Sequence, residues 1–177
     1  MKTGRLMIRE LKIEDALDMY EYTSKPEVSK FLTWEPHLNV EQDREFIKKA
    51  LSNKGTESYY FGIVLAEDPQ KLIGSIHIYG VNEMHKRCEI SYILNPDYSG
   101  KGYATEAVKE VIKWIFTTLG LRRVQALCVE GNDKSECLMK RCGMQYEGLL
   151  KNYAVLKDGK SYPMKIYSIC RGGSDQL

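Results

Sequence analysis

The sequence predicts a mixed α/β domain in which helices cover both faces of a sheet. Segments with the two-residue period of strands alternate along the 177 residues with segments of helical period. Three of the strand-like segments follow one another in the middle of the chain, with only short, turn-rich stretches between them. This spacing favours an antiparallel meander, because parallel strands need a longer crossover.

The first third of the chain supplies one strand and two helices. Residues 5–9 alternate as a half-buried strand does, and apolar side chains recur at helical spacing over residues 13–22. Asn39 and Gln42 are spaced as a capping box, in which each side chain bonds the backbone N–H of the other residue. They predict a second helix through Leu51, and the polar residues 52–58 are expected to form a loop.

The remaining elements follow from the same two periods. Residues 104–119 place their apolar side chains on one wide face of a helix. Gly120 should end this helix. A shorter helix is predicted over residues 133–142, closed by Gly143. Strands are predicted over residues 59–66, 71–79, 87–94 and 124–129, and as a final pair that runs to Cys170 and is joined at Asp158-Gly159.

Length and composition indicate a single domain over residues 1–170 and a flexible C-terminal tail over residues 171–177. The 26 basic and 24 acidic side chains give a net charge of +2, which argues against nucleic acid as a partner. No apolar run approaches the ~20 residues of a membrane span, and the first residues do not resemble a signal peptide. We therefore expect a cytoplasmic protein with no membrane partner.

The five cysteines show no CxxC spacing and no histidine at zinc-finger distance. We interpret them as reduced thiols that serve as small apolar side chains, and we expect no metal. The alternative, a nucleophilic cysteine, would need a histidine partner, and none of the three histidines lies in a recognisable signature.

The segment most informative about chemistry is the turn between the strand that ends near Pro96 and the helix that begins near Ala104. Gly100 and Gly102 let backbone N–H groups approach a bound group closely, and the start of the helix leaves unpaired donors with a partial positive charge. Such a turn is suited to phosphate, and Lys101 could add a point charge. The chain contains no GxxxxGK[ST] loop, and the turn lacks the third glycine of a dinucleotide fingerprint. A glycine-rich helix start without a ligand is the alternative.

The string GKGYATEA, residues 100–107, resembles the acetyl-CoA diphosphate loop of the GNAT N-acetyltransferases, in the form seen in the RimJ/RimL branch. Ser99 departs from the Gln or Arg that is usual at the start of this loop. The resemblance extends over about residues 5–170, and Ser91 and Met144 depart from the family's glycine and phenylalanine. Its other matching segments are residues 5–9 with 14–16, 71–76, 88–92, and 132–135 with 140–148.

The resemblance implies a central mixed, mostly antiparallel sheet of about seven strands, with helices on both faces. Two parallel strands, residues 89–94 and 124–129, should be splayed so that the pantetheine arm of acetyl-CoA pairs with their main chain. Asn132 should bond the same arm, although asparagine also favours the N-cap of a helix. The other implied cofactor-binding residues are Ile93, Leu94, Gly100, Lys101, Gly102, Tyr103, Ala104 and Thr105.

The implied reaction is direct attack of an acceptor amine on the thioester within a ternary complex. A base must remove a proton from the amine, and Glu89 is the candidate, unless it is only a solvated carboxylate or a partner of Arg87. A strand amide near Ile93 or Leu94 should meet the developing negative charge. Many members carry a tyrosine seven residues after the asparagine, where this chain has Met139, so Ser135 is the candidate donor to the leaving thiolate, unless it only bonds main chain locally.

The acceptor is less well defined than the cofactor. Trp34 and Glu35 lie in the loop that overhangs the acceptor side in this family, and they are candidate substrate-binding residues, although an indole is more often a packing anchor. The sequence thus predicts an acetyl-CoA-dependent N-acetyltransferase acting on a protein N-terminus or a small-molecule amine. The alternatives are a non-catalytic acyl-CoA sensor on the same fold and an antibiotic-modifying enzyme, for which an acidic run is missing. A homodimer is compatible with the sequence, and no feature decides it.

Overall fold

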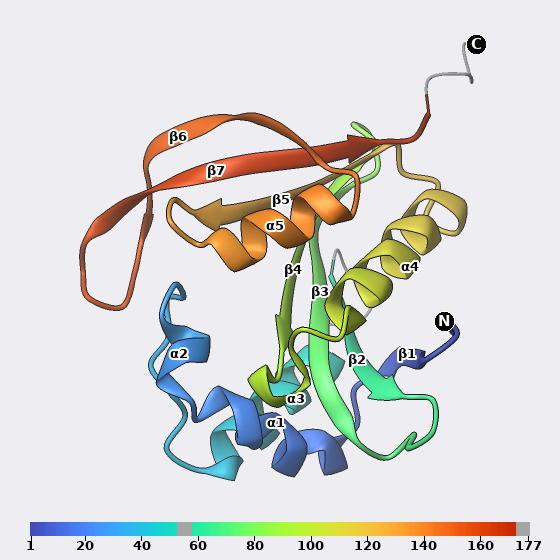
Figure 1. Cartoon of the computed structure of the whole chain (residues 1–177), viewed down its shortest axis with the longest axis vertical. Coiled ribbons are helices and arrows are strands. Elements are labelled where there is room, and N and C mark those ends of the chain that lie inside the picture. Colours follow the sequence, from blue (N-terminus) through green and yellow to red (C-terminus); the bar gives the residue numbers. More distant parts are fainter. Residues whose placement is uncertain (53–57, 173–177) are drawn as a thin grey trace.

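The computed structural model describes residues 1–52 and 58–172, and in that part of the chain seven strands form one sheet (Figure 1). The strand order is β1-β2-β3-β4-β5-β7-β6. The strands are β1 (Leu6–Glu10), β2 (Tyr59–Leu65), β3 (Leu72–Asn82), β4 (Arg87–Leu94), β5 (Arg123–Val129), β6 (Gln145–Val155) and β7 (Ser161–Cys170). The helices are α1 (Ala16–Thr23), α2 (Pro26–Ser29), α3 (Val40–Ser52), α4 (Tyr103–Thr117) and α5 (Asp133–Arg141).

Every helix and strand predicted from the sequence is present, within a few residues of its predicted ends. The sequence did not predict α2 or the two single 3-10 turns, η1 (Ile13–Asp15) and η2 (Pro96–Tyr98). Elements this short are not long enough to show a periodic pattern. The capping box is wrong in one half. Asn39 Oδ1 accepts from Gln42 N at 3.3 Å, but Gln42 Oε1 accepts from Leu38 N at 2.6 Å.

Two predicted segments fall mainly outside the described residues. Residues 53–57 of the predicted loop and residues 173–177 of the predicted tail belong to the parts that are not described. At the first residue of the predicted tail, Arg171 N donates to the carbonyl of Arg122 at 2.9 Å and Arg171 Nη1 to that of Phe116 at 3.2 Å. The chain is therefore held to the sheet one residue beyond β7.

Helices cover both faces of the sheet, as predicted, and two apolar clusters fill the spaces between the layers. The larger cluster lies beneath α4 and α5, and the smaller lies beneath α1 and α3. Strand alternation sorts side chains between them: in β4, Ile90 packs in the larger cluster and Ile93 against the smaller one. The buried side chains of α4 recur every three or four residues and so lie on one face of the helix. They are Ala107, Val108, Val111, Ile112 and Ile115.

The pair β4·β5 is the one parallel pair in the described sheet, and it is short. Its ladder consists of Arg87↔Arg123, Cys88↔Val124 and Glu89↔Gln125. All other neighbouring strands pair antiparallel, each over five or more positions. In Figure 1, β4 runs downward and β5 runs to the left from the place where they meet. The predicted splay is thus confirmed, and it opens a gap in the middle of the sheet.

Candidate active site

The gap between β4 and β5 begins immediately after the rung Glu89↔Gln125. Beyond that rung, β4 keeps its pairing with β3 through Leu94, and β5 keeps its pairing with β7 through Val129. The edges of β4 and β5 that face each other therefore carry backbone N–H and C=O groups without a strand partner. An extended group that bears amides can satisfy them as an added strand would. The main chain of Ile93 and Leu94, predicted to contact a pantetheine arm, lies along this edge.

The turn after β4 presents a row of free backbone donors. Gly100 and Gly102 have φ values of +80° and +81°, in the left-handed region that side chains with a Cβ disfavour. Gly102 is the N-cap of α4, and the first amide to find a helical acceptor is Glu106 N, which donates to the Gly102 carbonyl at 3.0 Å. Within the described residues, the amides of Tyr103, Ala104 and Thr105 have no protein acceptor. Together with the helix dipole they fit a diphosphate.

Lys101 has an exposed side chain, and its ammonium lies 5.7 Å from the centre of the Tyr98 ring. A cation above an aromatic face is held by the ring's negative π surface. Lys101 lies between Gly100 and Gly102, so its ammonium is close enough to interact with a phosphate bound at this turn.

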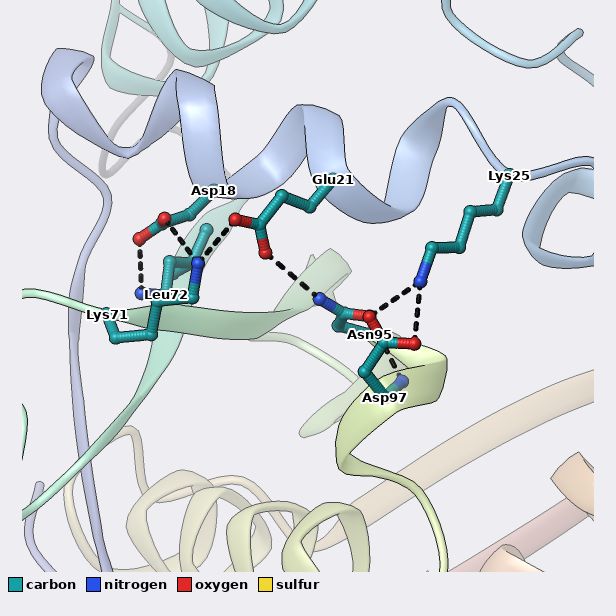
Figure 2. A network of polar contacts seen from close by, with 7 residues as sticks. All are labelled: Asp18, Glu21, Lys25, Lys71, Leu72, Asn95 and Asp97. Atoms are coloured by element: carbon teal, nitrogen blue, oxygen red, sulfur yellow. Dashed lines mark hydrogen bonds and ion pairs between the residues drawn. The ribbon is translucent and has the colours of Figure 1, made fainter.

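A polar network ties the end of β4 to α1, as Figure 2 shows. Asn95 is fully buried, and its Oδ1 accepts from Asp97 N at 3.2 Å and from Lys25 Nζ at 3.5 Å. Lys25 Nζ also donates to Asp97 Oδ1 at 2.8 Å, and Asn95 Nδ2 donates to Glu21 Oε2 at 3.5 Å. The entry to the glycine turn is therefore fixed by a buried amide rather than left as a free loop.

The same network continues to the start of β3 (Figure 2). Lys71 Nζ donates to Asp18 Oδ1 at 2.8 Å and to Glu21 Oε1 at 2.6 Å, and Asp18 Oδ2 accepts from Leu72 N at 2.7 Å. Burial alone would lower the pKa of Lys71, but the hydrogen bonds to Asp18 and Glu21 raise it, so the ammonium stays charged. Two strands and one helix are thereby held in register beside the gap.

Asn132 is the N-cap of α5, the alternative role that the sequence analysis gave it besides binding the pantetheine arm. Its Oδ1 accepts from Ser135 N at 3.3 Å. The side chain of Ser135 contacts another element, because its Oγ lies 2.9 Å from the hydroxyl of Tyr92. The Tyr92 hydroxyl also donates to the Ser135 carbonyl at 3.3 Å. A phenol from β4 thus reaches across the gap to the first turn of α5.

Tyr92 is a residue that the sequence analysis did not single out. Burial raises the pKa of its phenol above the ordinary value, so the hydroxyl carries its proton at neutral pH. Strand alternation could have found it, because Tyr92 lies on the same face of β4 as Ile90, the face covered by α4 and α5. At the position where a tyrosine is frequent, Met139 is fully buried in the larger cluster and offers no hydroxyl.

Glu89 occupies the last rung before the gap and is bonded through both carboxylate oxygens. The Tyr79 hydroxyl donates to Oε1, and Gln125 Nε2 donates to Oε2 at 2.9 Å. Arg123 Nε donates to Gln125 Oε1 at 3.3 Å, which fixes the orientation of the amide. Glu89 is therefore not paired with Arg87, and it is held in place by neutral donors.

An open cavity of about 170 Å³ lies against this carboxylate. Its lining residues are Tyr79, Gly80, Arg87, Cys88, Glu89 and Gln125. The cavity is lined by the Glu89 carboxylate and the Arg87 guanidinium. The two side chains lie on the same face of β4 because they are two positions apart. The cavity therefore presents both charge signs to a small ligand.

An aromatic row extends from this cavity along β3 and β2. His77 stacks on Tyr60 with ring centres 3.8 Å apart and on Tyr79 at 4.8 Å. His77 Nε2 lies 2.7 Å from Ser58 Oγ. Burial lowers the pKa of His77 to about 4, so the ring is neutral at physiological pH. The wall beside Glu89 is consequently uncharged and flat.

The loop that carries Trp34 and Glu35 makes a different set of contacts. The Trp34 ring centre is 5.1 Å from that of His37, and Glu35 Oε2 is 3.1 Å from Lys157 Nζ. Lys157 also donates to Ser29 Oγ at 2.9 Å, so the β6–β7 turn is joined to the chain around α2. Over residues 1–52 and 58–172, no hydrogen bond, ion pair or ring contact joins Trp34 or Glu35 to Glu89 or Ser135.

Three of the five cysteines are buried. Cys88, Cys128 and Cys142 are buried, and burial raises the pKa of their thiols to about 12, 11 and 11. These thiols are protonated, as small apolar side chains would be. Among the described residues, no cluster of three His, Cys, Asp or Glu side chains is arranged to hold a metal, and no helix is both long and apolar enough to cross a membrane.

A splayed parallel pair followed by a glycine turn with free amides defines an acyl-CoA-binding acyltransferase site. The chain matches the family model described as acetyltransferase (GNAT) domain over residues 5–145. It is 33% identical over 171 residues to the uncharacterized N-acetyltransferase p20 of Bacillus licheniformis, covering 96% of this chain and 94% of that protein. This protein therefore belongs to the GNAT acetyltransferases and is an N-acetyltransferase that uses acetyl-CoA.

Solved structures agree with this assignment. The crystal structure of a GNAT-family acetyltransferase from Bacillus anthracis matches with a TM-score of 0.85 at 30% identity, covering 96% of this chain and 97% of that one. The microcin C7 self-immunity acetyltransferase MccE, solved with acetyl-CoA and AMP, has the same fold with a TM-score of 0.83 at 23% identity, covering 96% and 94%. The family resemblance read from the sequence is confirmed.

Proposed function

We propose that this enzyme transfers the acetyl group of acetyl-CoA to a single primary amine, and that a peptide N-terminus is its acceptor class. The observation that carries the proposal is the position of Glu89. It stands at the last rung before the β4·β5 gap, fixed by two neutral donors, and it shares a cavity with one cation. Acetyl-CoA supplies the acyl group as a thioester, and the protein supplies binding, a base and a proton donor.

The donor-binding roles follow from the free backbone groups. We assign the diphosphate to the amides of residues 100–105, with Lys101 adding a point charge, because these donors converge at the start of α4. We assign the pantetheine arm to the main chain of Ile93 and Leu94 in the gap. The Oδ1 of Asn132 caps α5, so its Nδ2 is the group that can donate to the pantetheine arm.

Glu89 is assigned as the base that accepts a proton from the acceptor amine, because only the unprotonated amine carries a lone pair for attack. The amine nitrogen then bonds the carbonyl carbon while the carbon–sulfur bond breaks. The nitrogen releases its second proton to solvent, which balances the proton that the leaving sulfur takes up. A main-chain amide near Ile93 or Leu94 meets the negative charge that develops on the carbonyl oxygen. Both partners are bound at once, so transfer is direct.

The leaving sulfur needs a proton, and the Tyr92–Ser135 pair is assigned to provide it. Ser135 Oγ can donate to the thiolate while it accepts from the Tyr92 hydroxyl, since the two oxygens are 2.9 Å apart. Raising the pKa of Tyr92 through burial keeps that hydroxyl protonated for this purpose. The pair replaces the hydroxyl that Met139 lacks.

The choice of a peptide N-terminus rests on charge. Proteins of this fold act on small-molecule amines and on protein N-termini. Those similar to this chain include a spermidine N(1)-acetyltransferase of Vibrio cholerae and a ribosomal-protein-S5-alanine acetyltransferase of Vibrio fischeri. A polyamine carries several positive charges, and Arg87 in the cavity repels them. A peptide brings one ammonium for Glu89, carbonyl oxygens for Arg87 and a side chain for the aromatic row. In this assignment Glu35, paired with Lys157, holds the overhanging loop, and Trp34 lines the acceptor side.

Release of free thiol from acetyl-CoA tests the proposal, with tripeptides of varied first residue, their N-acetylated forms and spermidine as acceptors. We expect turnover with free peptides, none with N-acetylated ones, and a lower kcat/KM for spermidine. Mass spectrometry should place the acetyl group on the α-amine. A kcat/KM for spermidine above that of every peptide would overturn the acceptor assignment, and Arg87→Gln should raise the spermidine rate selectively.

A further inference from the structure

The residue just before β1, Arg5, lies against the glycine turn although the two are almost a hundred residues apart. Arg5 Nη1 donates to the carbonyl of Lys101 at 2.9 Å, and Arg5 Nε donates to Glu106 Oε2 at 2.7 Å. Arg5 Nη2 lies 2.6 Å from the same Glu106 oxygen, and the guanidinium lies 4.7 Å from the centre of the Tyr103 ring. One side chain thus touches both the turn and the first turn of α4.

Glu106 is itself fixed from the N-terminal side. Its Oε1 accepts from Thr3 Oγ1 at 2.5 Å and from Arg5 N at 3.1 Å. Burial alone would raise its pKa, but the hydrogen bonds from Thr3 and Arg5 hold the pKa of Glu106 below its ordinary value. The carboxylate is therefore charged at neutral pH and binds two nitrogens of the guanidinium through Oε2, so Arg5 has a fixed orientation.

The contact with Lys101 determines where the next amide points. In a trans peptide the C=O of one residue and the N–H of the next lie in one plane and point in opposite directions. Because Arg5 binds the Lys101 carbonyl, the N–H of Gly102 is directed away from Arg5. Gly102 has φ +81°, and a Cβ placed on it would lie 3.5 Å from Arg5 Nη2. The peptide between Lys101 and Gly102 is thus held in one of its two orientations.

We infer that Arg5 is a positioning residue for the donor's diphosphate: through the Lys101 carbonyl it presets the Gly102 N–H as a phosphate donor. Without this contact the peptide can rotate, and part of the binding free energy would be used to select the competent orientation. This inference rests on the assignment of the diphosphate to residues 100–105. It assigns Arg5 no contact with the reacting atoms.

The test uses Arg5→Lys, which keeps the charge but loses the planar fork. The matched control is Arg9→Lys, since Arg9 makes a similar two-pronged pair with Asp15, at 2.8 and 2.7 Å, away from the turn. Calorimetry with CoA should show binding about tenfold weaker in Arg5→Lys, the size of one hydrogen bond to a charged group. The control should bind CoA as the wild type does.

S-acetylpantetheine provides the second readout, because it contains the thioester but no diphosphate. Arg5→Lys should lower kcat/KM for acetyl-CoA about tenfold, through KM, and leave kcat/KM for S-acetylpantetheine unchanged. Glu106→Gln, which weakens the anchor of Arg5, should lower kcat/KM for acetyl-CoA by a smaller factor and also leave kcat/KM for S-acetylpantetheine unchanged. Equal losses with both donors would mean a general structural effect and would overturn the inference, as would unchanged CoA affinity.

The two assignments fail in different ways. If the turn does not bind the diphosphate, the wild type itself will show no preference for acetyl-CoA over S-acetylpantetheine. If only the role of Arg5 is wrong, the wild type will prefer acetyl-CoA and both variants will keep that preference in full.

Discussion

The Tyr92 hydroxyl on β4 and Ser135 Oγ at the start of α5 lie 2.9 Å apart, across the gap at which β4 and β5 separate. The residues are 43 positions apart in the chain, and the contact exists because β4 and the helix that follows β5 flank the same opening. In the proposed mechanism, this hydroxyl pair gives the leaving sulfur a proton from a group that burial keeps protonated.

The Tyr92–Ser135 pair predicts non-additive kinetics. Tyr92→Phe and Ser135→Ala should each lower kcat by about tenfold to a hundredfold, less than the ~10²–10⁴ of a complete general acid, because the other hydroxyl remains. The double variant should be little worse than the poorer single variant, since the two act as one unit. Steady-state kcat at saturating acetyl-CoA measures this. Losses that multiply in the double variant would show that the hydroxyls act independently.

Glu89→Gln should lower kcat most at low pH and leave CoA affinity intact, because the amide keeps the shape of the carboxylate but accepts no proton. At high pH the free amine loses its proton to solvent, so the base is needed less. Glu45→Gln, at an exposed carboxylate that faces Lys48, is the control. A pH–rate profile identical to that of the wild type would remove Glu89 from the role of base.

Gly102→Asp should abolish CoA binding, because it places a carboxylate beside the diphosphate on a backbone with φ +81°. Gly120→Asp separates charge from backbone strain, since Gly120 also has a positive φ, +64°, and lies beyond the other end of α4. We expect Gly120→Asp to lose stability and keep CoA affinity in calorimetry. Retained affinity in Gly102→Asp would contradict the assignment of the diphosphate.

Gly74→Ala should destabilise the protein by about 1–3 kcal/mol, the usual cost of overpacking. A Cβ at Gly74 would lie 2.5 Å from the Ile93 carbonyl oxygen and 3.1 Å from Leu94 Cα, so the end of β4 must move. CoA affinity should fall as well, because this end of β4 forms one edge of the gap. Gly148→Ala on β6, where a Cβ meets nothing within 4 Å, is the control in urea denaturation. Equal stabilities of the two variants would disprove the clash.

His77 should make stability depend on mild acid. Its pKa is lowered by burial from 6.5 to about 4, so between these pH values the unfolded chain binds a proton that the folded chain does not. The contribution of neutral His77 is therefore complete above pH 6.5 and is lost as the pH falls toward 4. Thermal melts of His77→Phe should show a smaller fall in Tm over this interval, whereas a variant at exposed His85 should behave as the wild type.

Much of the fold was predictable because its signals are local. The wide apolar face of α4, the alternation within each of the strands β2, β3 and β4, and the glycines of the turn before α4 each occupy fewer than twenty consecutive residues. Short elements such as α2 were missed for the same reason, since four residues hold no period. Glu89 and Ser135 were predicted from motif positions, but their partners Tyr79, Gln125 and Tyr92 come from strands that sequence spacing does not relate.

The sequence by itself determined the order of elements, the family and the glycine turn before α4, because apolar period, turn chemistry and motif spacing act over short stretches of chain. Only the tertiary structure decided that β4 and β5 part after three rungs, that a phenol crosses the gap to Ser135, and that Arg5 fastens the Lys101 carbonyl. These contacts join residues 36 to 96 positions apart. They are set by how the sheet and helices pack, and no local pattern records them.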